Sequence, residues 1–290
     1  MNINYNWVGR ILLLPLWILS APLWAGDISS DVRSTEPTTL NKRGGFLEIG
    51  IAAAIEERIQ RSLNPDQDGD LSLAVRLSLS AGYRYDRLFF EASESGFDGL
   101  NMGVVLWEND RWRFDALLAN VAGNLTVESD EPPPPTTEAE RNRAIIERDS
   151  FYVAAGGRLS GYFGNTLIQF RLVSDWYDDN GLLGSARVGR NWQLGNWNIQ
   201  AVAGMRYNSS QFNNYLYGIT SEEASERFPE FTTKHAWISE VELGASLPLK
   251  ENWVYSSRLR FRHYPGSVTD SPLVIDGGDV ILTTAIHYVF

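Results

Sequence analysis

A repeated alternation of apolar and polar residues constrains this chain more than any other feature. In Leu71–Tyr85, every second residue from Leu71 to Tyr83 is apolar or Ala, and the residues between them are small or polar. A period of two indicates a β-strand with two unlike faces. The pattern recurs along the chain and predicts about twelve strands, at Gly45–Glu56, Leu71–Tyr85, Leu88–Ser93, Leu100–Trp107, Trp112–Ala122, Phe151–Tyr162, Thr166–Trp176, Leu182–Leu194, Trp197–Asn208, Ala236–Leu247, Trp253–Tyr264 and Asp279–Phe290.

The connections between these segments alternate between short and long. The short ones are Asp86-Arg87, Glu108–Arg111, Phe163–Asn165, Gly195-Asn196 and Pro248–Asn252. The longer ones are Glu57–Asp70, Glu94–Gly99, Gly123–Ser150, Tyr177–Gly181, Ser209–His235 and Pro265–Gly278. Outer-membrane barrels have short periplasmic turns and long outer loops, whereas a soluble sandwich has no reason to obey this parity. The sequence therefore predicts an all-β, antiparallel transmembrane β-barrel with both chain termini in the periplasm.

The last strand supports the same fold. Val280, Leu282, Ile286, Tyr288 and Phe290 share one face of Asp279–Phe290. On a soluble protein such an apolar edge strand would invite aggregation, but a closed barrel has no edge. The strand resembles the C-terminal assembly signal of bacterial outer-membrane barrels, which Ile286, Tyr288 and Phe290 would carry. That resemblance implies the barrel assembly machinery as a partner.

Composition excludes several other classes of protein. The chain has 290 residues, 25 basic and 36 acidic side chains and a formal net charge of -11, which argues against a nucleic-acid binder. It has no cysteine, which excludes disulfides, thiol nucleophiles and Cys-ligated metals. A mean hydropathy of -0.23 leaves no room for a bundle of apolar helices.

The N-terminal residues are expected to be separate from the barrel. Residues 1–25 contain one charge, Arg10, then a short apolar run and a small residue at Ala25, which predicts a cleaved secretory signal peptide. Residues 26–43 are polar and are predicted to form a flexible periplasmic segment. Residues 44–290 form the predicted barrel domain, located in the outer membrane of a Gram-negative bacterium.

Aromatic residues occur where a membrane boundary would place them. Trp112, Trp197 and Trp253 each open a strand after a short turn, and Trp176, Trp237 and Tyr264 lie near the opposite strand ends. Two rings of interfacial aromatic residues are typical of barrels in contact with membrane lipid and lipopolysaccharide.

Charged residues fall on the faces predicted to line the lumen. They are Arg76, Arg84, Arg113, Asp115, Arg171, Arg206, Glu240, Glu242, Arg258, Arg260 and Arg262. Two interpretations remain open. The charges form a salt-bridged plug that makes the barrel rigid, or the arginines line a constriction that favours anionic solutes.

Several stretches resemble the MipA/OmpV family of outer-membrane proteins. They are Tyr83–Phe90, the loop Asn214–Ala224, Ser271–Val274 and the terminal Phe290. In the loop, Tyr215, Tyr217, Gly218 and Glu223 match the family's Tyr-Tyr-Gly-Val-(Ser/Thr)-x-x-Glu-Ala pattern. The link Glu56 to Asp70 and the Pro132–Pro135 loop depart from the family.

The resemblance implies a non-enzymatic protein without cofactors, which binds a periplasmic lytic transglycosylase and a penicillin-binding protein as a scaffold. A narrow passive channel for small anionic solutes is the alternative.

Other candidate sites are weaker. The three histidines, His235, His263 and His287, lie in no nucleophile–base motif, so no catalytic residue is expected. Asn64, Asp66 and Asp68 match the first half of a calcium-binding loop, but Val75 stands where a bidentate Glu is required. We therefore expect a solvated acidic turn, with weak calcium binding as the alternative. Ser221–Arg227 is predicted to form one helical turn, in a loop that folds into the barrel mouth.

Overall fold

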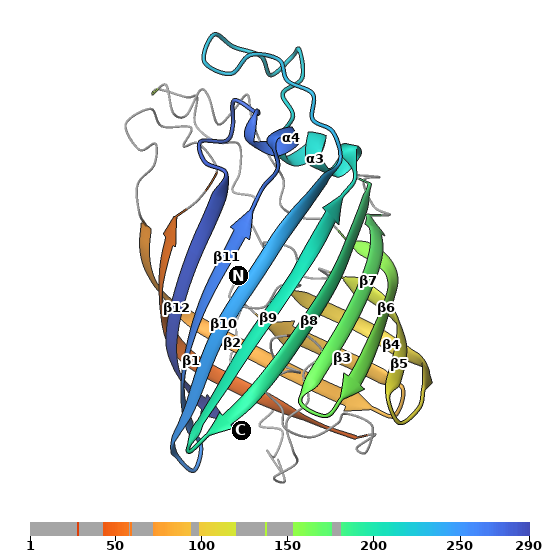
Figure 1. The fold of residues 1–290 in the computed structure, drawn as a ribbon, viewed down its shortest axis with the longest axis vertical. Coiled ribbons are helices and arrows are strands. Elements are labelled where there is room, and N and C mark those ends of the chain that lie inside the picture. The colour runs from red at the N-terminus through yellow and green to blue at the C-terminus, as the bar shows by residue number, and fades with distance from the viewer. Residues whose placement is uncertain are drawn as a thin grey trace, which may run out of the picture.

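The computed structural model describes residues 28, 43–57, 59, 72–93, 99–119, 137, 153–175 and 181–290. In these residues, twelve antiparallel strands form a closed barrel in which each strand pairs with its neighbours in sequence and the last pairs with the first (Figure 1). The strands are β1 (Arg43–Glu57), β2 (Ser72–Tyr85), β3 (Leu88–Ser93), β4 (Leu100–Glu108), β5 (Trp112–Ala119), β6 (Ala154–Phe163), β7 (Thr166–Asp175), β8 (Leu182–Leu194), β9 (Trp197–Asn208), β10 (Ala236–Lys250), β11 (Trp253–His263) and β12 (Gly278–Val289). The predicted fold class and strand number are confirmed.

Closure depends on the pairing of β1 with β12. The register places Ile51 opposite Ile286 and Ala52 opposite Ala285. The backbone N–H of Phe290 donates to the carbonyl oxygen of Leu47 at 2.9 Å, so the pairing extends to the last residue. The apolar strand identified at the C-terminus therefore has a partner along its whole length, and its backbone groups are satisfied.

The two faces of the barrel have opposite polarity. Large apolar side chains point outward and are highly exposed, as in Leu73 and Val75, each 71% exposed. Charged side chains point inward and are buried, as in Asp115 and Glu242, each 0% exposed. This is the reverse of a water-soluble barrel, and it is the arrangement that lipid outside requires. Within the described part of the chain, no helix is both long enough and apolar enough to cross a membrane.

The short turns lie at one end of the barrel, and the two long connections that the structure describes throughout, residues 209–235 and 264–277, lie at the other (Figure 1). The C-terminus is at the short-turn end, and the helices α3 (Ser210–Tyr217) and α4 (Gly266–Thr269) are at the long-loop end.

Three local predictions need correction. The predicted turn Pro248–Asn252 is shorter, because β10 continues through a bulge at Pro248 to Lys250. Ser221–Arg227 forms turns and bends rather than a helix, and the helix of this loop is α3, which precedes it. Tyr264 is buried and donates its hydroxyl to Asp279 Oδ2 at 2.9 Å, so it does not belong to an outer aromatic ring. It comes two residues after the inward-facing Arg262, so the alternation of β11 itself points its side chain inward.

Candidate functional site: the charged lumen and its loop cap

One cluster of buried charges lies between β3, β5 and β6. The guanidinium of Arg158 donates to both oxygens of Glu91 at 2.8 Å, and to Asp115 Oδ2 from Nε at 3.0 Å and from Nη2 at 2.9 Å. Arg113 Nε lies 3.0 Å from Asp115 Oδ1. Two cations therefore face two anions in a site with almost no solvent exposure, where charge pairs are screened least. The ring of Phe89 packs beside the cluster, 5.1 Å from the Arg158 guanidinium carbon.

A second group of charges lines the wall formed by β8 to β11. Glu240 accepts a hydrogen bond from Arg187 Nε at 3.1 Å and lies 3.6 Å from Arg206 Nε. Glu242 Oε2 accepts from Arg260 Nη2 at 2.6 Å.

A polar cavity of about 100 Å³ lies beside this wall. Its lining includes Arg76, Arg258 and Arg260, together with two carboxylates, those of Glu56 and Glu242. Arg76 Nη1 contacts Glu56 Oε1 at 3.3 Å. The lining therefore carries three guanidinium groups and two carboxylates.

Three further inward charges lie elsewhere along the barrel. Arg84 pairs with Glu108 at the short-turn end, with Nη2 2.9 Å from Oε2. Arg262 pairs with Asp279 at the long-loop end, with Nη2 2.7 Å from Oδ2. Arg171 Nη2 donates to Asn101 Oδ1 at 3.1 Å. Every charged residue that the sequence placed in the lumen thus contacts an inward partner or lines the cavity.

Helix α3 packs into the long-loop end of the barrel. Ser209 caps this helix, because its Oγ accepts the N–H of Phe212 at 3.3 Å. Phe212 packs into the interior against Phe89, Val105 and Leu183. At the other end of α3, Tyr217 packs against Ile238 and Tyr264, and burial raises the pKa of the Tyr217 hydroxyl above its usual value. The helix is therefore fixed to two sides of the barrel mouth.

Two later segments of the chain are hydrogen-bonded to α3. Together with α3 they form a loop cap, which we define as residues 209–235 and 265–275. Asn214 Oδ1 accepts from the backbone N–H of Thr233 at 2.6 Å. Ser271 Oγ donates to the carbonyl oxygen of Tyr217 at 2.6 Å. Phe228, which is completely buried, packs with Ile219 and Leu273. These contacts make the cap a packed element of the fold.

The residues of the family motif all lie in the cap. Tyr215 and Tyr217 belong to α3, and Gly218 ends it. Glu223 Oε2 accepts the backbone N–H of Thr220 at 2.8 Å, which closes a tight turn. The motif residues therefore form part of the cap. Gly218 ends the helix, and the carboxylate of Glu223 holds the turn that follows.

The aromatic residues at the short-turn end form edge-to-face contacts. Trp112 packs on Phe163 with ring centroids 5.6 Å apart, Trp197 packs on Tyr255 at 6.2 Å, and Trp253 packs on Tyr288 at 5.3 Å. At the long-loop end, Trp237 lies on the outer face with its ring 5.0 Å from that of Tyr207. The predicted ring member Trp176 lies outside the described residues.

Several contacts between side chains in the lumen could not be predicted from any local motif. Arg158 and Glu91 complete the buried cluster, yet they lie 67 residues apart. Ser256 Oγ lies 3.0 Å from His287 Nε2, and both side chains are buried. To predict these contacts, one would need both the alternation within each strand and the register between neighbouring strands.

Other predicted sites cannot be placed. Asn64, Asp66 and Asp68 and the signal peptide lie outside the described residues. No group of three or more possible metal ligands occurs in the part of the chain that the structure describes. Of residues 26–42, the structure describes Ile28 alone, which is buried against Leu167 and Val202.

Comparisons with known proteins give the family. The family model described as "MltA-interacting protein MipA" matches residues 49–290. The MltA-interacting protein of Escherichia coli K12 is 26% identical over 205 residues, which cover 69% of this chain and 79% of the relative. The putative outer membrane protein YiaT of the same strain is 26% identical over 114 residues, or 39% of this chain, and the match spans about half the length (46%) of YiaT.

Solved porins resemble the barrel only loosely. An anion-selective porin from Comamonas acidovorans is 8% identical with a TM-score of 0.36, over 86% of this chain and all but 1% of the porin. The channel DcaP of Acinetobacter baumannii is 7% identical with a TM-score of 0.36, over 85% of this chain and 96% of the channel. At these TM-scores the resemblance says nothing about function.

Both the family and the fold are those of outer-membrane proteins rather than of known enzymes. The names of the relatives and the lipid-facing exterior place the protein in the outer membrane of Gram-negative bacteria. Because the family model covers most of the sequence, from residue 49 to the last residue, the chain belongs to the MipA family of outer-membrane β-barrel proteins.

Proposed function

We propose that this protein is a scaffold that binds cell-wall enzymes from the periplasmic side of the outer membrane. The observation that carries this proposal is the charged interior. Buried ion pairs line the described lumen, and α3 packs against the strands at one end of it. Such an interior favours a barrel that acts through its surface. The relative named MltA-interacting protein supports an association with a lytic transglycosylase, and the family resemblance adds a penicillin-binding protein.

The short-turn end offers the contact surface in this proposal. Lys250 at the end of β10 and Glu251 in the turn after it are both exposed, and the neighbouring strand begins with the exposed Trp253. Aromatic side chains beside exposed charges are common in protein interfaces.

Site-specific photo-crosslinking in living cells tests this proposal. A photoreactive residue at Glu251 should capture a lytic transglycosylase or a penicillin-binding protein, and one within residues 26–43 should do the same. The matched control is Glu222, which is exposed at the opposite end of the barrel. Capture of neither enzyme from the short-turn end, or of the same enzymes from Glu222, would contradict the scaffold.

A narrow passive channel for small anions is a second candidate, favoured by the cavity at Arg76, Arg258 and Arg260. Excess positive charge in a constricted lumen selects anions. Purified protein in planar bilayers should then give small anion-selective conductance steps, and Arg258→Glu should shift the reversal potential towards cation selectivity. Absence of steps from the folded wild type would exclude the channel, whereas steps with the same selectivity in Arg258→Glu would exclude this cavity as the filter.

A further inference from the structure

One residue that precedes the first strand lies inside the barrel. Ile28 is completely buried and packs with Leu167 and Val202, which are 3% and 1% exposed, and with the partly buried Tyr162. Leu167 belongs to β7 and Val202 to β9. The N-terminal segment is therefore in contact with strands from the middle of the chain.

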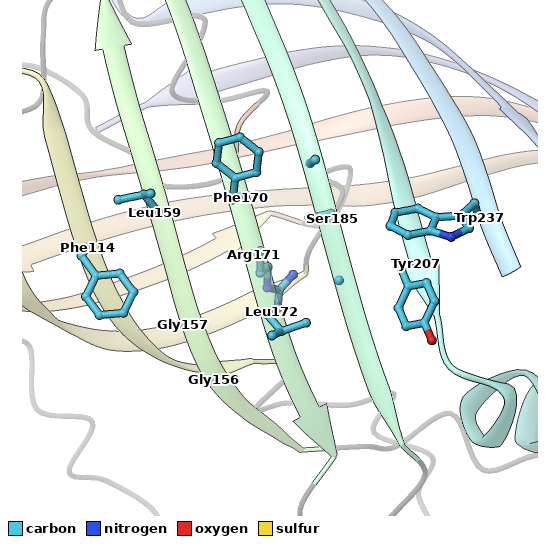
Figure 2. Close-up of a pocket in the computed structure, with 12 residues that line it drawn as sticks. Phe114, Gly156, Gly157, Leu159, Phe170, Arg171, Leu172, Ser185, Tyr207 and Trp237 are labelled. Carbon is cyan, nitrogen blue, oxygen red and sulfur yellow. The ribbon is translucent and has the colours of Figure 1, made fainter. Parts of the chain in front are cut away.

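The side chains that Ile28 contacts belong to the inner face of the barrel wall. Figure 2 shows Leu172 on the outer face of β7 and the side chain of Arg171 behind the sheet. Leu167 comes four residues before Arg171, so the alternation of β7 places it on the same inner face. Val202 pairs directly with Glu242, whose buried carboxylate faces the lumen, and directly opposite residues share a face.

A glycine separates the two apolar side chains. Leu167 pairs with Gly189, and Gly189 pairs with Val202, so the three residues form one row across β7, β8 and β9. Gly189 has no side chain, which leaves room in the row for Ile28. The next inner position of β7, Gln169, is polar. We call the row of Leu167, Gly189 and Val202 the inner apolar site. Its two apolar side chains would meet water without a cover, so their burial by an isoleucine is favourable.

The inner apolar site lies across the barrel from the point where the chain enters the wall. Strand β1 begins at Arg43 at the short-turn end, because Arg43 pairs with Tyr85, the last residue of β2 before a short turn. In the closed order of strands, β7 is six strands from β1 in either direction. The fifteen residues from Ile28 to Arg43 can span at most about 50 Å. A twelve-strand barrel is roughly 25 Å wide, for strands about 4.8 Å apart and tilted by about 40°. The chain is therefore long enough to connect opposite walls.

We propose that the inner apolar site is a docking site for the chain's own N-terminal segment, residues 26–42, and that Ile28 is the side chain that binds there. The apolar side chain of Ile28 matches the site, and the contact is present in the structure. Docking keeps the start of this segment inside the barrel and limits the part that a periplasmic partner can reach. The inference is independent of the scaffold and of the channel, because its test reads the position of one residue, whatever the barrel binds or conducts.

Pairs of cysteines test the docking, because the chain has no cysteine of its own. Ile28→Cys is combined with Leu167→Cys or with Val202→Cys in the full chain, and barrels purified from outer membranes are treated with a thiol crosslinker that has a short spacer. Either pair should be linked in most molecules, as measured by mass spectrometry of the digested protein. The matched control is Ile28→Cys with Ser80→Cys. Ser80 is also buried, but it lies on β2 beside β1, and it should be linked at least tenfold less.

The reactivity of a single cysteine gives a second measurement. Ile28→Cys should react with a water-soluble maleimide about tenfold more slowly than Glu251→Cys, which is exposed at the same end of the barrel. Adding Leu167→Gln should restore most of that rate, because it makes the inner apolar site polar.

Heat-modifiable migration establishes that each variant is folded. Equal linking of Ile28→Cys to positions 202 and 80 in folded barrels would overturn the docking site, as would the absence of links to both positions 167 and 202. A reaction of Ile28→Cys as fast as that of Glu251→Cys would show that residue 28 is not held in the lumen. An unchanged rate in folded Leu167→Gln would overturn the role of the inner apolar site.

Discussion

Arg158→Met should lower the free energy of unfolding of the barrel by about 3–5 kcal/mol, because it leaves two buried carboxylates without their main cation. Glu91 and Asp115 both contact Arg158, and all three residues are at most 5% exposed. Methionine keeps an unbranched apolar stem and removes the charge. Urea unfolding in detergent micelles, followed by tryptophan fluorescence, gives the free energy.

The matched control for this prediction is Arg76→Met. Arg76 is also an inward arginine paired with a glutamate, but its side chain is 35% exposed and its contact with Glu56 is a longer 3.3 Å. We expect a loss of at most about 1 kcal/mol there, as for pairs in contact with solvent. Adding Glu91→Gln to Arg158→Met should recover part of the stability, because it removes the excess negative charge and leaves the pair of Arg113 and Asp115. Equal losses in the two single variants would show that the buried cluster is no more important than an exposed pair.

Deletion of Phe290 should reduce the amount of folded barrel in the outer membrane far more than packing alone explains. Phe290 is 41% exposed, and its ring packs edge to face on Tyr288 at 4.7 Å. Losing one aromatic contact would cost roughly 2–3 kcal/mol at most, which a closed barrel can tolerate. If the assembly machinery recognises the last strand, the variant should instead accumulate in the periplasm or be degraded. Heat-modifiable protein in outer-membrane fractions measures the folded yield.

Ile281→Ser is the control on the same strand. Ile281 is partly buried and lines the lumen cavity, away from the outer face that the machinery would contact. We expect its folded yield to match wild type. Equal yields for the Phe290 deletion and wild type would refute recognition of the terminal residue.

The fold could be predicted well from the sequence, because the alternation of residue types within each strand shows which side chains face lipid. In a transmembrane barrel, apolar residues at alternate positions face lipid, and the polar residues between them face the lumen. Leu73, Leu77 and Arg76 could therefore be assigned to their faces from β2 alone. The bounds of β3, β8 and β9 agree with the prediction, because turns such as Gly195-Asn196 interrupt the alternation sharply.

The cap and the pairing of charges were not predictable in the same way. Ser221–Arg227 has the composition of a helix start, yet the helix forms at Ser210–Tyr217, where Phe212 and Tyr217 can enter the barrel mouth. Ser209 also accepts a hydrogen bond from the backbone of Leu182, on a neighbouring strand. Local propensity was outweighed by burial against strands that are distant in sequence.

The sequence by itself thus determined the number of strands, which face of each meets lipid, and which charges turn inward. Only the tertiary structure decided that Arg158 bridges Glu91 and Asp115, that α3 packs into the mouth, and that Ile28 lies in the lumen against Leu167 and Val202. The physical reason is that orientation is a property of one strand, with a period set by its backbone. Pairing depends instead on the register of neighbouring strands, and that register is fixed only when the barrel closes.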